Sequence, residues 1–246
     1  MASSDLKELE KWLKSQIVGQ ASLVQRLIIA LLADGHLLVE GAPGLAKTRA
    51  IKSLSEGIEA DFHRIQFTPD LLPGDITGTE IYRPQDGSFT FQQGPVFNNL
   101  VLADEVNRAP AKVQSALLEA MGERQISIGS KTYPLPKLFL VMATQNPIEQ
   151  EGTYPLPEAQ LDRFLLHHTV NYPDASSEKD ILRLNRAESI DESNAPAKKI
   201  SAESIFTARK EIMAIHMNEN VEEYLIQLVL ASRNPGNYSK DLEEWI

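Results

Sequence analysis

The sequence predicts an α/β fold in which a mainly parallel sheet is covered by helices on both faces. Short, nearly continuous apolar runs such as Leu138 to Ala143 are typical of strands that are buried on both sides. Amphipathic helical segments alternate with these runs, which favours parallel strands joined by crossover helices. The first apolar strand, Leu37 to Glu40, leads into a Gly/Pro-rich loop that ends in Lys47-Thr48, an arrangement typical of a phosphate-binding loop, or P-loop.

Composition restricts the class of protein further. The chain has 246 residues, of which 42% are hydrophobic and 24% charged, so it can bury one large domain and the start of a second. The sequence has no cysteine, which excludes a disulfide framework, a thiol nucleophile and a thiolate zinc site. No apolar run approaches the roughly 20 residues that span a bilayer, and we expect a cytoplasmic protein without a membrane span. The net charge of −10 disfavours nucleic acid as a partner.

The N-terminal elements form the first βαβ unit of the predicted sheet. Apolar residues recur at helical spacing over Leu6 to Leu13 and Leu23 to Leu32, so two amphipathic helices precede the first strand. An apolar pair, Ile17-Val18, lies between these helices. After the P-loop, Lys47 to Ile58 is predicted to be a helix and Phe62 to Phe67 the second strand.

Two segments interrupt the alternation of strands and helices. Thr68 to Pro95 is rich in Gly and Pro and contains two short candidate strands joined through Asp86-Gly87, which predicts a hairpin insertion. A second candidate hairpin pairs Gln125 to Ile128 with Lys131 to Leu135. Each hairpin is a candidate functional loop; the alternative is that it merely caps an edge of the sheet.

The later elements complete the sheet and add a helical region. Val101 to Ala103 and Leu138 to Ala143 are apolar runs that predict strands, separated by a helix over Ala111 to Met121, and Leu165 to Val170 is a further candidate strand. From Pro173 onward the pattern is helical, with segments over 177–187, 201–217 and 221–232. We therefore expect an α/β nucleotide-binding domain over residues 1–172 and an all-helical lid domain over 173–246.

The P-loop candidate has the groups that bind a polyphosphate. Backbone N–H groups and a helix N-terminus would face the anion, Lys47 would contact the β/γ oxygens, and Thr48 Oγ would bind Mg²⁺. Ala46 stands where the usual pattern has Gly, and its methyl group suits most backbone conformations but not a strongly left-handed one. The alternative is a strand-to-helix turn with a surface lysine.

An acidic pair, Asp104-Glu105, follows the strand that begins near Val101. Parallel strands deliver their C-terminal residues to one crevice, so Asp104 is expected to hold Mg²⁺ through water and Glu105 to polarise the attacking water. A helix N-terminal charge pair is the alternative for such a dipeptide. Its position about 57 residues after Lys47, with one βαβ unit and an insertion between, favours the catalytic role.

Two further polar residues fit phosphoryl transfer. Asn146 follows the strand over Leu138 to Ala143, and its amide is a candidate for orienting water or contacting the γ-phosphate; the alternative is a turn residue before Pro147. Arg163 ends a short helix and is a candidate for stabilising charge on a transferred phosphoryl group, in its own chain or a neighbour. The alternative for Arg163 is an ordinary surface pair with Asp162.

In this order the motifs make the chain resemble the AAA+ ATPases, and within them the MoxR family. The resemblance covers nearly the whole sequence, and the Thr68 to Pro95 hairpin is similar to the insertion that marks the helix-2-insert clade. The family also tolerates Ala before the P-loop lysine. The residues that carry the resemblance are Ile17-Val18-Gly19-Gln20, Glu40 to Thr48, Phe67 to Asp75, Gly94-Pro95, Leu102 to Pro110, Ala143 to Pro147 and Gln160 to Phe164.

The resemblance implies a role for each motif. It implies adenine beside Ile17 and Val18, the Walker B pair at Asp104 and Glu105, sensor 1 at Asn146, and an arginine finger at Arg163 that reaches a neighbouring subunit's nucleotide. The implied ATP/ADP-binding residues are Ile17, Val18, Gly41, Ala42, Pro43, Gly44, Leu45, Ala46, Lys47, Thr48, Asp104 and Asn146; the implied catalytic residues are Lys47, Glu105, Asn146 and Arg163; Mg²⁺ is assigned to Thr48 and Asp104.

The function implied by the resemblance is Mg²⁺-dependent ATP hydrolysis in a hexameric ring, used for chaperone-like remodelling or metal-cofactor insertion, often with von Willebrand factor A domain partners. A nucleotide-gated switch with little turnover is the first alternative. A DNA-translocating motor is the second, and the net charge and the few basic residues of the hairpins weigh against it. No sensor 2 Arg is identifiable before the terminal Trp245-Ile246, so we expect an incomplete lid. Nucleotide binding should survive, whereas lid closure and full hydrolysis do not follow from the sequence.

Overall fold

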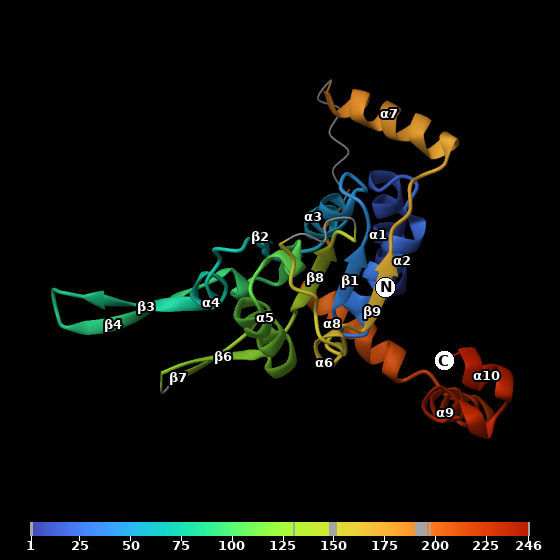
Figure 1. The fold of residues 1–246 in the computed structure, drawn as a ribbon. Coiled ribbons are helices and arrows are strands. Elements are labelled where there is room, and N and C mark those ends of the chain that lie inside the picture. Colours follow the sequence, from blue (N-terminus) through green and yellow to red (C-terminus); the bar gives the residue numbers. More distant parts are fainter. Residues whose placement is uncertain (1, 130, 148–151, 190–195, 197, 246) are drawn as a thin grey trace. The chain divides into compact units, whose positions relative to one another are not determined.

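The computed structural model describes residues 2–129, 131–147, 152–189, 196 and 198–245 (Figure 1). These residues form two compact units, 1–208 and 209–246, and each is described by itself. The division falls within helix α8 (Ala202–Met213). The predicted domain boundary at residues 172 and 173 remains a prediction.

A parallel sheet of five strands organises the first unit, in the order β2-β5-β8-β1-β9 (Figure 1). All four pairings are parallel. Because the strands run in one direction, the residues that follow them collect at one edge of the sheet. The strands are β1 (Leu37–Glu40), β2 (Phe62–Gln66), β5 (Leu100–Asp104), β8 (Leu140–Gln145) and β9 (Leu166–Thr169).

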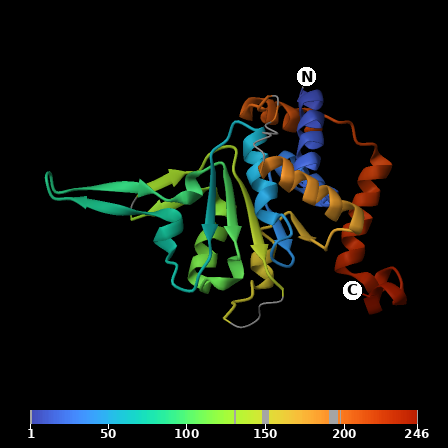
Figure 2. The same cartoon turned by 90° about the horizontal axis from the view of Figure 1, so that it is seen from above.

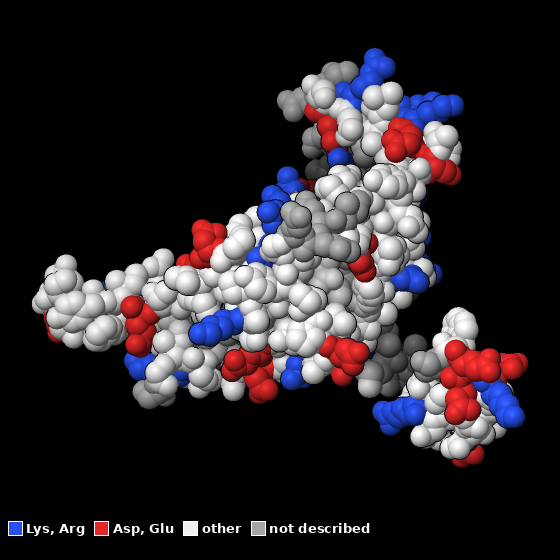
Figure 3. Space-filling model, in the orientation of Figure 1, with Lys and Arg blue, Asp and Glu red and all other residues white. Residues whose placement is uncertain are grey.

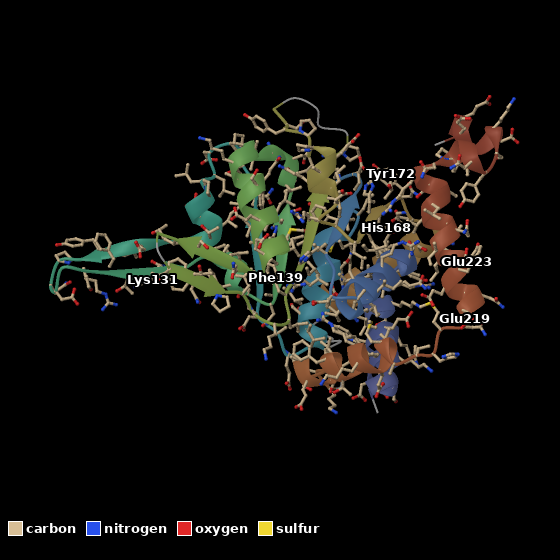
Figure 4. All side chains as sticks on the ribbon, turned by 90° about the horizontal axis from the view of Figure 1, so that it is seen from below. Lys131, Phe139, His168, Tyr172, Glu219 and Glu223 are labelled. Carbon is tan, nitrogen blue, oxygen red and sulfur yellow. The ribbon has the colours of Figure 1, made fainter. Side chains whose placement is uncertain are left out.

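Alternate side chains of the strands face two separate hydrophobic cores. Leu37 and Val39 pack in one core with α1 (Ala2–Gln16), α2 (Ala21–Leu32) and α3 (Lys47–Gly57). Leu38 lies in the second core, with α4 (Pro73–Thr77) and α5 (Ala111–Glu123), and this core also holds the fully buried Phe139 labelled in Figure 4. Helices therefore cover both faces of the sheet (Figure 2), as the apolar strand sequences predict.

Two hairpins extend from the α5 side of the sheet. The first pairs β3 (Gly78–Arg83) with β4 (Ser88–Gln93), and the second pairs β6 (Gln125–Ile128) with β7 (Lys131–Pro134), whose first residue is labelled in Figure 4. Their aromatic rings meet, because Phe91 and Tyr133 stack with ring centroids 4.2 Å apart. Position 78 requires glycine, because its φ is 94° and a Cβ there would collide with the Gln92 carbonyl.

The remaining regular elements of the described chain are helices and short 3₁₀ turns. The first unit contains α6 (Glu158–Leu161), α7 (Ala175–Ser189) and the buried part of α8. The second unit contains α9 (Glu219–Arg233), on which Figure 4 labels Glu219 and Glu223, and α10 (Lys240–Trp245). Asn218 caps α9 by accepting a hydrogen bond from the Asn220 N–H. Short 3₁₀ turns are η1 (Pro95–Phe97), η2 (Val106–Arg108) and η3 (Pro235–Asn237).

The observed elements confirm the predicted fold class and change several boundaries. Strand β8 starts at Leu140, two residues later than predicted, because Asn99 takes the backbone groups there: its Nδ2 donates to Leu138 O at 2.9 Å and its carbonyl accepts from Leu140 N at 2.8 Å. Helix α8 ends at Met213 instead of Met217. Among the described residues, no helix is long and apolar enough to cross a membrane.

Candidate nucleotide site

The P-loop connects the end of β1 to the start of α3. Gly44 has φ of 84°, and Ala46 has φ of 58° and ψ of 14°, so both lie in the left-handed region. The expectation that alanine would not suit a strongly left-handed position is therefore wrong for Ala46. A left-handed L-residue costs roughly 1–2 kcal/mol relative to the right-handed form, so the loop is held in a strained conformation at the residue before Lys47.

Lys47 is the first residue of α3 and points back across the loop. Its Nζ donates to the Gly41 carbonyl, and the residue is only 9% exposed. Burial lowers the pKa of the Lys47 ammonium, while the nearby carboxylates of Asp104, Glu105 and Glu40 act in the opposite direction. The ammonium thus lies in a partly dry pocket where an arriving phosphate would meet a poorly hydrated cation.

Asp104 ends β5, and both of its oxygens are engaged. Oδ1 accepts from Thr144 Oγ1 at 2.6 Å, and Oδ2 accepts from Arg64 Nε at 3.0 Å and Arg64 Nη2 at 2.6 Å. Thr144 lies on β8 and Arg64 on β2, the two neighbours of β5 in the sheet. The carboxylate is therefore fixed from both sides by the adjacent strands.

Glu105 follows Asp104 with φ of 57°, so its side chain leaves the strand in a different direction. Its N–H donates to Thr144 Oγ1 at 2.9 Å. Its Oε2 accepts from Gln66 Nε2 and from Arg108 Nη1, each at 2.9 Å. Thr144 thus positions both acidic residues, and Glu105 is additionally tied to β2 and η2.

One cavity of about 390 Å³ brings the predicted phosphate, metal and base residues together at the carboxyl edge of the sheet. Thr48 and Asp104 supply a hydroxyl and a carboxylate to it, the hard oxygen donors that suit Mg²⁺. No cluster of three or more His, Asp or Glu side chains in the described chain could hold a metal by itself. The cavity is lined by Pro43, Gly44, Leu45, Ala46, Lys47, Thr48, Arg49, Arg64, Asp104, Glu105 and Asn146.

A second cavity of about 390 Å³ lies on the other side of the P-loop and is a candidate for the base of a nucleotide. Val18 lines it together with Pro43 to Ala46, Tyr172, which is labelled in Figure 4, and residues of α7. Ile17 is 1% exposed and belongs to the core under α1 and α3. Of the apolar pair, Val18 therefore reaches the cavity, and the adenine contact of Ile17 remains a prediction.

Arg163 lies away from the other site residues. It borders a hollow of about 270 Å³ with residues of α5 and α6, where its guanidinium Cζ lies 3.4 Å from the position of a Cβ on Gly122. The N–H of Leu165 donates to His36 O, just before β1 begins, whereas the P-loop follows the end of β1. Arg163 is thus near the amino ends of the strands, and the structure does not bring it to the nucleotide cavity of its own chain.

Comparison with known proteins agrees with this geometry. Residues 36–166 match the model of the ATPase family associated with various cellular activities (AAA). Chaperone MoxR1 of Mycobacterium tuberculosis is 47% identical over 235 residues, which is 95% of this chain and 61% of that protein. Protein YeaC of Bacillus subtilis is 44% identical over 88% of this chain and 67% of its own length. The chain belongs to the MoxR family of AAA+ ATPases.

Further relatives support the assignment to the MoxR family. Protein MoxR of Methylorubrum extorquens is 31% identical over 92% of this chain and 68% of its own length. A solved structure from Cytophaga hutchinsonii, described as a candidate ATPase, has a TM-score of 0.87 at 48% identity and covers 99% of this chain and 72% of that one. This MoxR chain spans 61% of the length of MoxR1.

Sequence reasoning missed three residues of this MoxR site. In the sequence Arg64 and Gln66 belong only to a predicted strand, and Thr144 only to the segment that precedes Asn146. The signal that could have found them is the parallel pairing of β2 with β5, which places Gln66 opposite Asp104. Polar side chains at that end of an otherwise apolar sheet face the same crevice as the acidic pair.

Proposed function

We propose that this chain is the ATP-binding and ATP-hydrolysing module of a MoxR-type, chaperone-like remodelling ATPase. The observation that carries the proposal is the single cavity shared by Lys47, Thr48, Asp104, Glu105 and Asn146. These residues come from three separate segments, and each follows the carboxyl end of a central strand. A cation, a hydroxyl, two carboxylates and an amide in one cavity are the set that phosphoryl transfer requires.

Each residue has a role that its surroundings support. Loop N–H groups and Lys47 would bind the β- and γ-phosphates of ATP. Thr48 and Asp104 would hold Mg²⁺, which supplies charge neutralisation on the phosphate oxygens. Glu105 would take the proton of the attacking water, once its carboxylate exchanges the bonds from Gln66 and Arg108 for that water. Asn146 would orient the same water or the γ-phosphate.

Arg163 is proposed to act on the nucleotide of a neighbouring copy. It borders a hollow at the amino ends of the strands, whereas the nucleotide cavity lies at the carboxyl ends. A head-to-tail contact between copies joins two different surfaces and closes into a ring when the rotation permits. From the family resemblance we propose that this ring is a hexamer, that it remodels a client protein, and that von Willebrand factor A domain proteins are candidate partners.

A nucleotide-gated switch with little turnover is the second candidate function. The observation that favours it is the state of the base: Glu105 Oε2 accepts two hydrogen bonds from protein side chains at 2.9 Å. A DNA motor has less support. The hairpin strands β3 and β4 with their turn contain one basic residue, Arg83, and acidic and basic side chains are interspersed on the face shown in Figure 3.

Steady-state Mg²⁺-ATPase activity measured against protein concentration tests the proposal. Specific activity should rise with concentration and fall by on the order of 10³-fold in Arg163→Ala, and Glu105→Gln should lose turnover while still binding ATP. Arg183→Ala is the matched control, since Arg183 is 78% exposed and pairs with Asp180 across one turn of α7. Tight ATP binding without turnover in the wild-type chain would reject the enzyme in favour of the switch, and unchanged turnover in Glu105→Gln would show that Glu105 is not the base.

A further inference from the structure

Arg64 is a half-exposed cation beside the acidic pair, and the proposed hydrolysis does not use it. It lies on β2, and its Nε and Nη2 both donate to Oδ2 of Asp104, at 3.0 and 2.6 Å. Its Nη2 also donates to Gln66 Oε1 at 2.8 Å. A guanidinium held by two partners, one of them ionised, is fixed in place on the proposed metal carboxylate.

The guanidinium also faces the nucleotide cavity. Arg64 lines it together with Lys47 and Thr48, and 49% of its side chain is exposed, against 11% for Asp104. On its Oδ2 side, the Asp104 carboxylate is therefore covered by the positive guanidinium of Arg64.

Asp104 has little acceptor capacity left in this arrangement. An ionised carboxylate offers about four lone-pair sites. Arg64 takes both on Oδ2, and Thr144 takes one on Oδ1. A hydrated divalent cation beside Asp104 would need the same lone pairs. It would also repel a guanidinium bound to the same carboxylate. Arg64 and the metal are thus competitors for one carboxylate.

We propose that Arg64 is the internal counter-cation of Asp104 in the metal-free site, and that it gives up this carboxylate when Mg²⁺ enters with the nucleotide. The proposal rests on the proposed function, since it takes Asp104 as the metal carboxylate. Arg64 is then a positioning residue with two opposite effects. It offsets the charge of Asp104 against the polyphosphate when no metal is present, and it weakens the gain in nucleotide affinity that the metal provides.

The ratio of two dissociation constants measures this competition directly. ADP binding is titrated calorimetrically with excess EDTA and again with saturating Mg²⁺, for the wild-type chain, Arg64→Gln, Arg64→Lys and Arg108→Gln. The metal-free constant divided by the Mg²⁺ constant should rise about tenfold in Arg64→Gln, as expected when a hydrogen-bonded charge pair is lost. Arg64→Lys keeps the charge without the two parallel donors, and its ratio should lie between the two.

Arg108→Gln is the matched control because it removes the same charge from Glu105 instead of Asp104. Its ratio should stay within about twofold of the wild-type value. If both constants of Arg64→Gln change by one factor, Arg64 has only a structural role and the proposal is wrong. If the ratio falls, Arg64 orients Asp104 for the metal, which also overturns it. Absence of ADP binding by the wild-type chain would overturn the proposed function together with this inference.

Discussion

Ala46 stores backbone strain at the junction of the P-loop and α3, and its conformation gives the first prediction. It has φ of 58° without being glycine, so Ala46→Gly should remove a cost of roughly 1–2 kcal/mol. The larger backbone entropy of glycine in the unfolded chain offsets about 0.5–1 kcal/mol of that. The free energy of unfolding in urea, without nucleotide, should therefore rise by about 0.5 kcal/mol.

Ala50→Gly is the control for Ala46→Gly, since it makes the same substitution one helical turn further along α3. Ala50 is fully buried within the helix, so this variant should lose about 1 kcal/mol or more. If both variants lose stability, the left-handed conformation of Ala46 is not a source of strain.

His36 makes the fold sensitive to acid. It lies just before β1, its Nδ1 accepts from the Val141 N–H at 3.0 Å, and burial together with Arg124 lowers its pKa to about 4. A base with a lowered folded pKa destabilises the protein as pH falls, because the unfolded chain binds the proton first. Between pH 7.5 and pH 5 the free energy of unfolding should therefore drop by about 2 kcal/mol from this group.

Urea unfolding from pH 7.5 to 4.5 checks the His36 prediction. His36→Gln keeps a side-chain acceptor for Val141 N–H but cannot be protonated, so its pH dependence should be shallower by that amount. Parallel curves for wild type and variant would show that other groups cause the acid sensitivity.

The site residues that belong to sequence motifs could be predicted, whereas those that only the packing of the strands places at the site could not. Lys47, Asp104 and Asn146 each follow an apolar strand in the sequence, so their meeting at one sheet edge could be inferred from topology alone. Arg64 belongs to no motif, and its contact with Asp104 depends on which strand lies beside β5. The burial of Ile17 was hidden for the same reason, because an apolar residue beside a loop fits a ligand and a core equally well.

At the scale of elements, period and turn signals were sufficient for long segments and failed for short ones. Asp86-Gly87 and the alternation around it predicted the β3–β4 hairpin. Helices α4 and α10 have only five and six residues, too few to show a helical period. The α4 segment instead depends on local capping, with Pro73 at its start and Asp75 accepting from the Leu72 N–H.

The two hairpins are expected to be energetically coupled through Phe91 and Tyr133. The rings stack with centroids 4.2 Å apart and an interplanar angle of 29°. A double-mutant cycle with Phe91→Ala and Tyr133→Ala should give a coupling energy of about 0.5–1.5 kcal/mol in urea unfolding.

Tyr82 and Phe89 provide the control cycle, because they pair across the strands of one hairpin and are both exposed. Their coupling should be smaller, since water remains around both rings. A cycle at Phe91 and Tyr133 that closes within about 0.3 kcal/mol would show that the hairpins are independent.

At the scale of the whole molecule, the residues proposed for the site lie in two separate places of one unit. The P-loop and the acidic pair lie at the carboxyl ends of the strands, and Arg163 lies near the amino ends, beside α5. If Arg163 acts on a nucleotide, as proposed, that nucleotide must lie in a second copy of the chain. This separation could be predicted only from the family resemblance, because the sequence around Arg163 fits a surface pair equally well.

Mixing two inactive variants should restore activity if Arg163 acts on a neighbouring copy. Lys47→Ala cannot bind the phosphates but still offers Arg163, and Arg163→Ala keeps an intact cavity but offers no finger. In a randomly mixed 1:1 ring, about a quarter of the interfaces would join an intact cavity to an intact Arg163. ATPase activity should therefore recover to the order of a quarter of the wild-type value, whereas either variant alone stays near zero.

The double variant Lys47→Ala/Arg163→Ala, mixed with Arg163→Ala, is the control and should stay inactive. An active Arg163→Ala chain would contradict the finger itself, and an inactive mixture of stable rings would place Arg163 outside the neighbouring site.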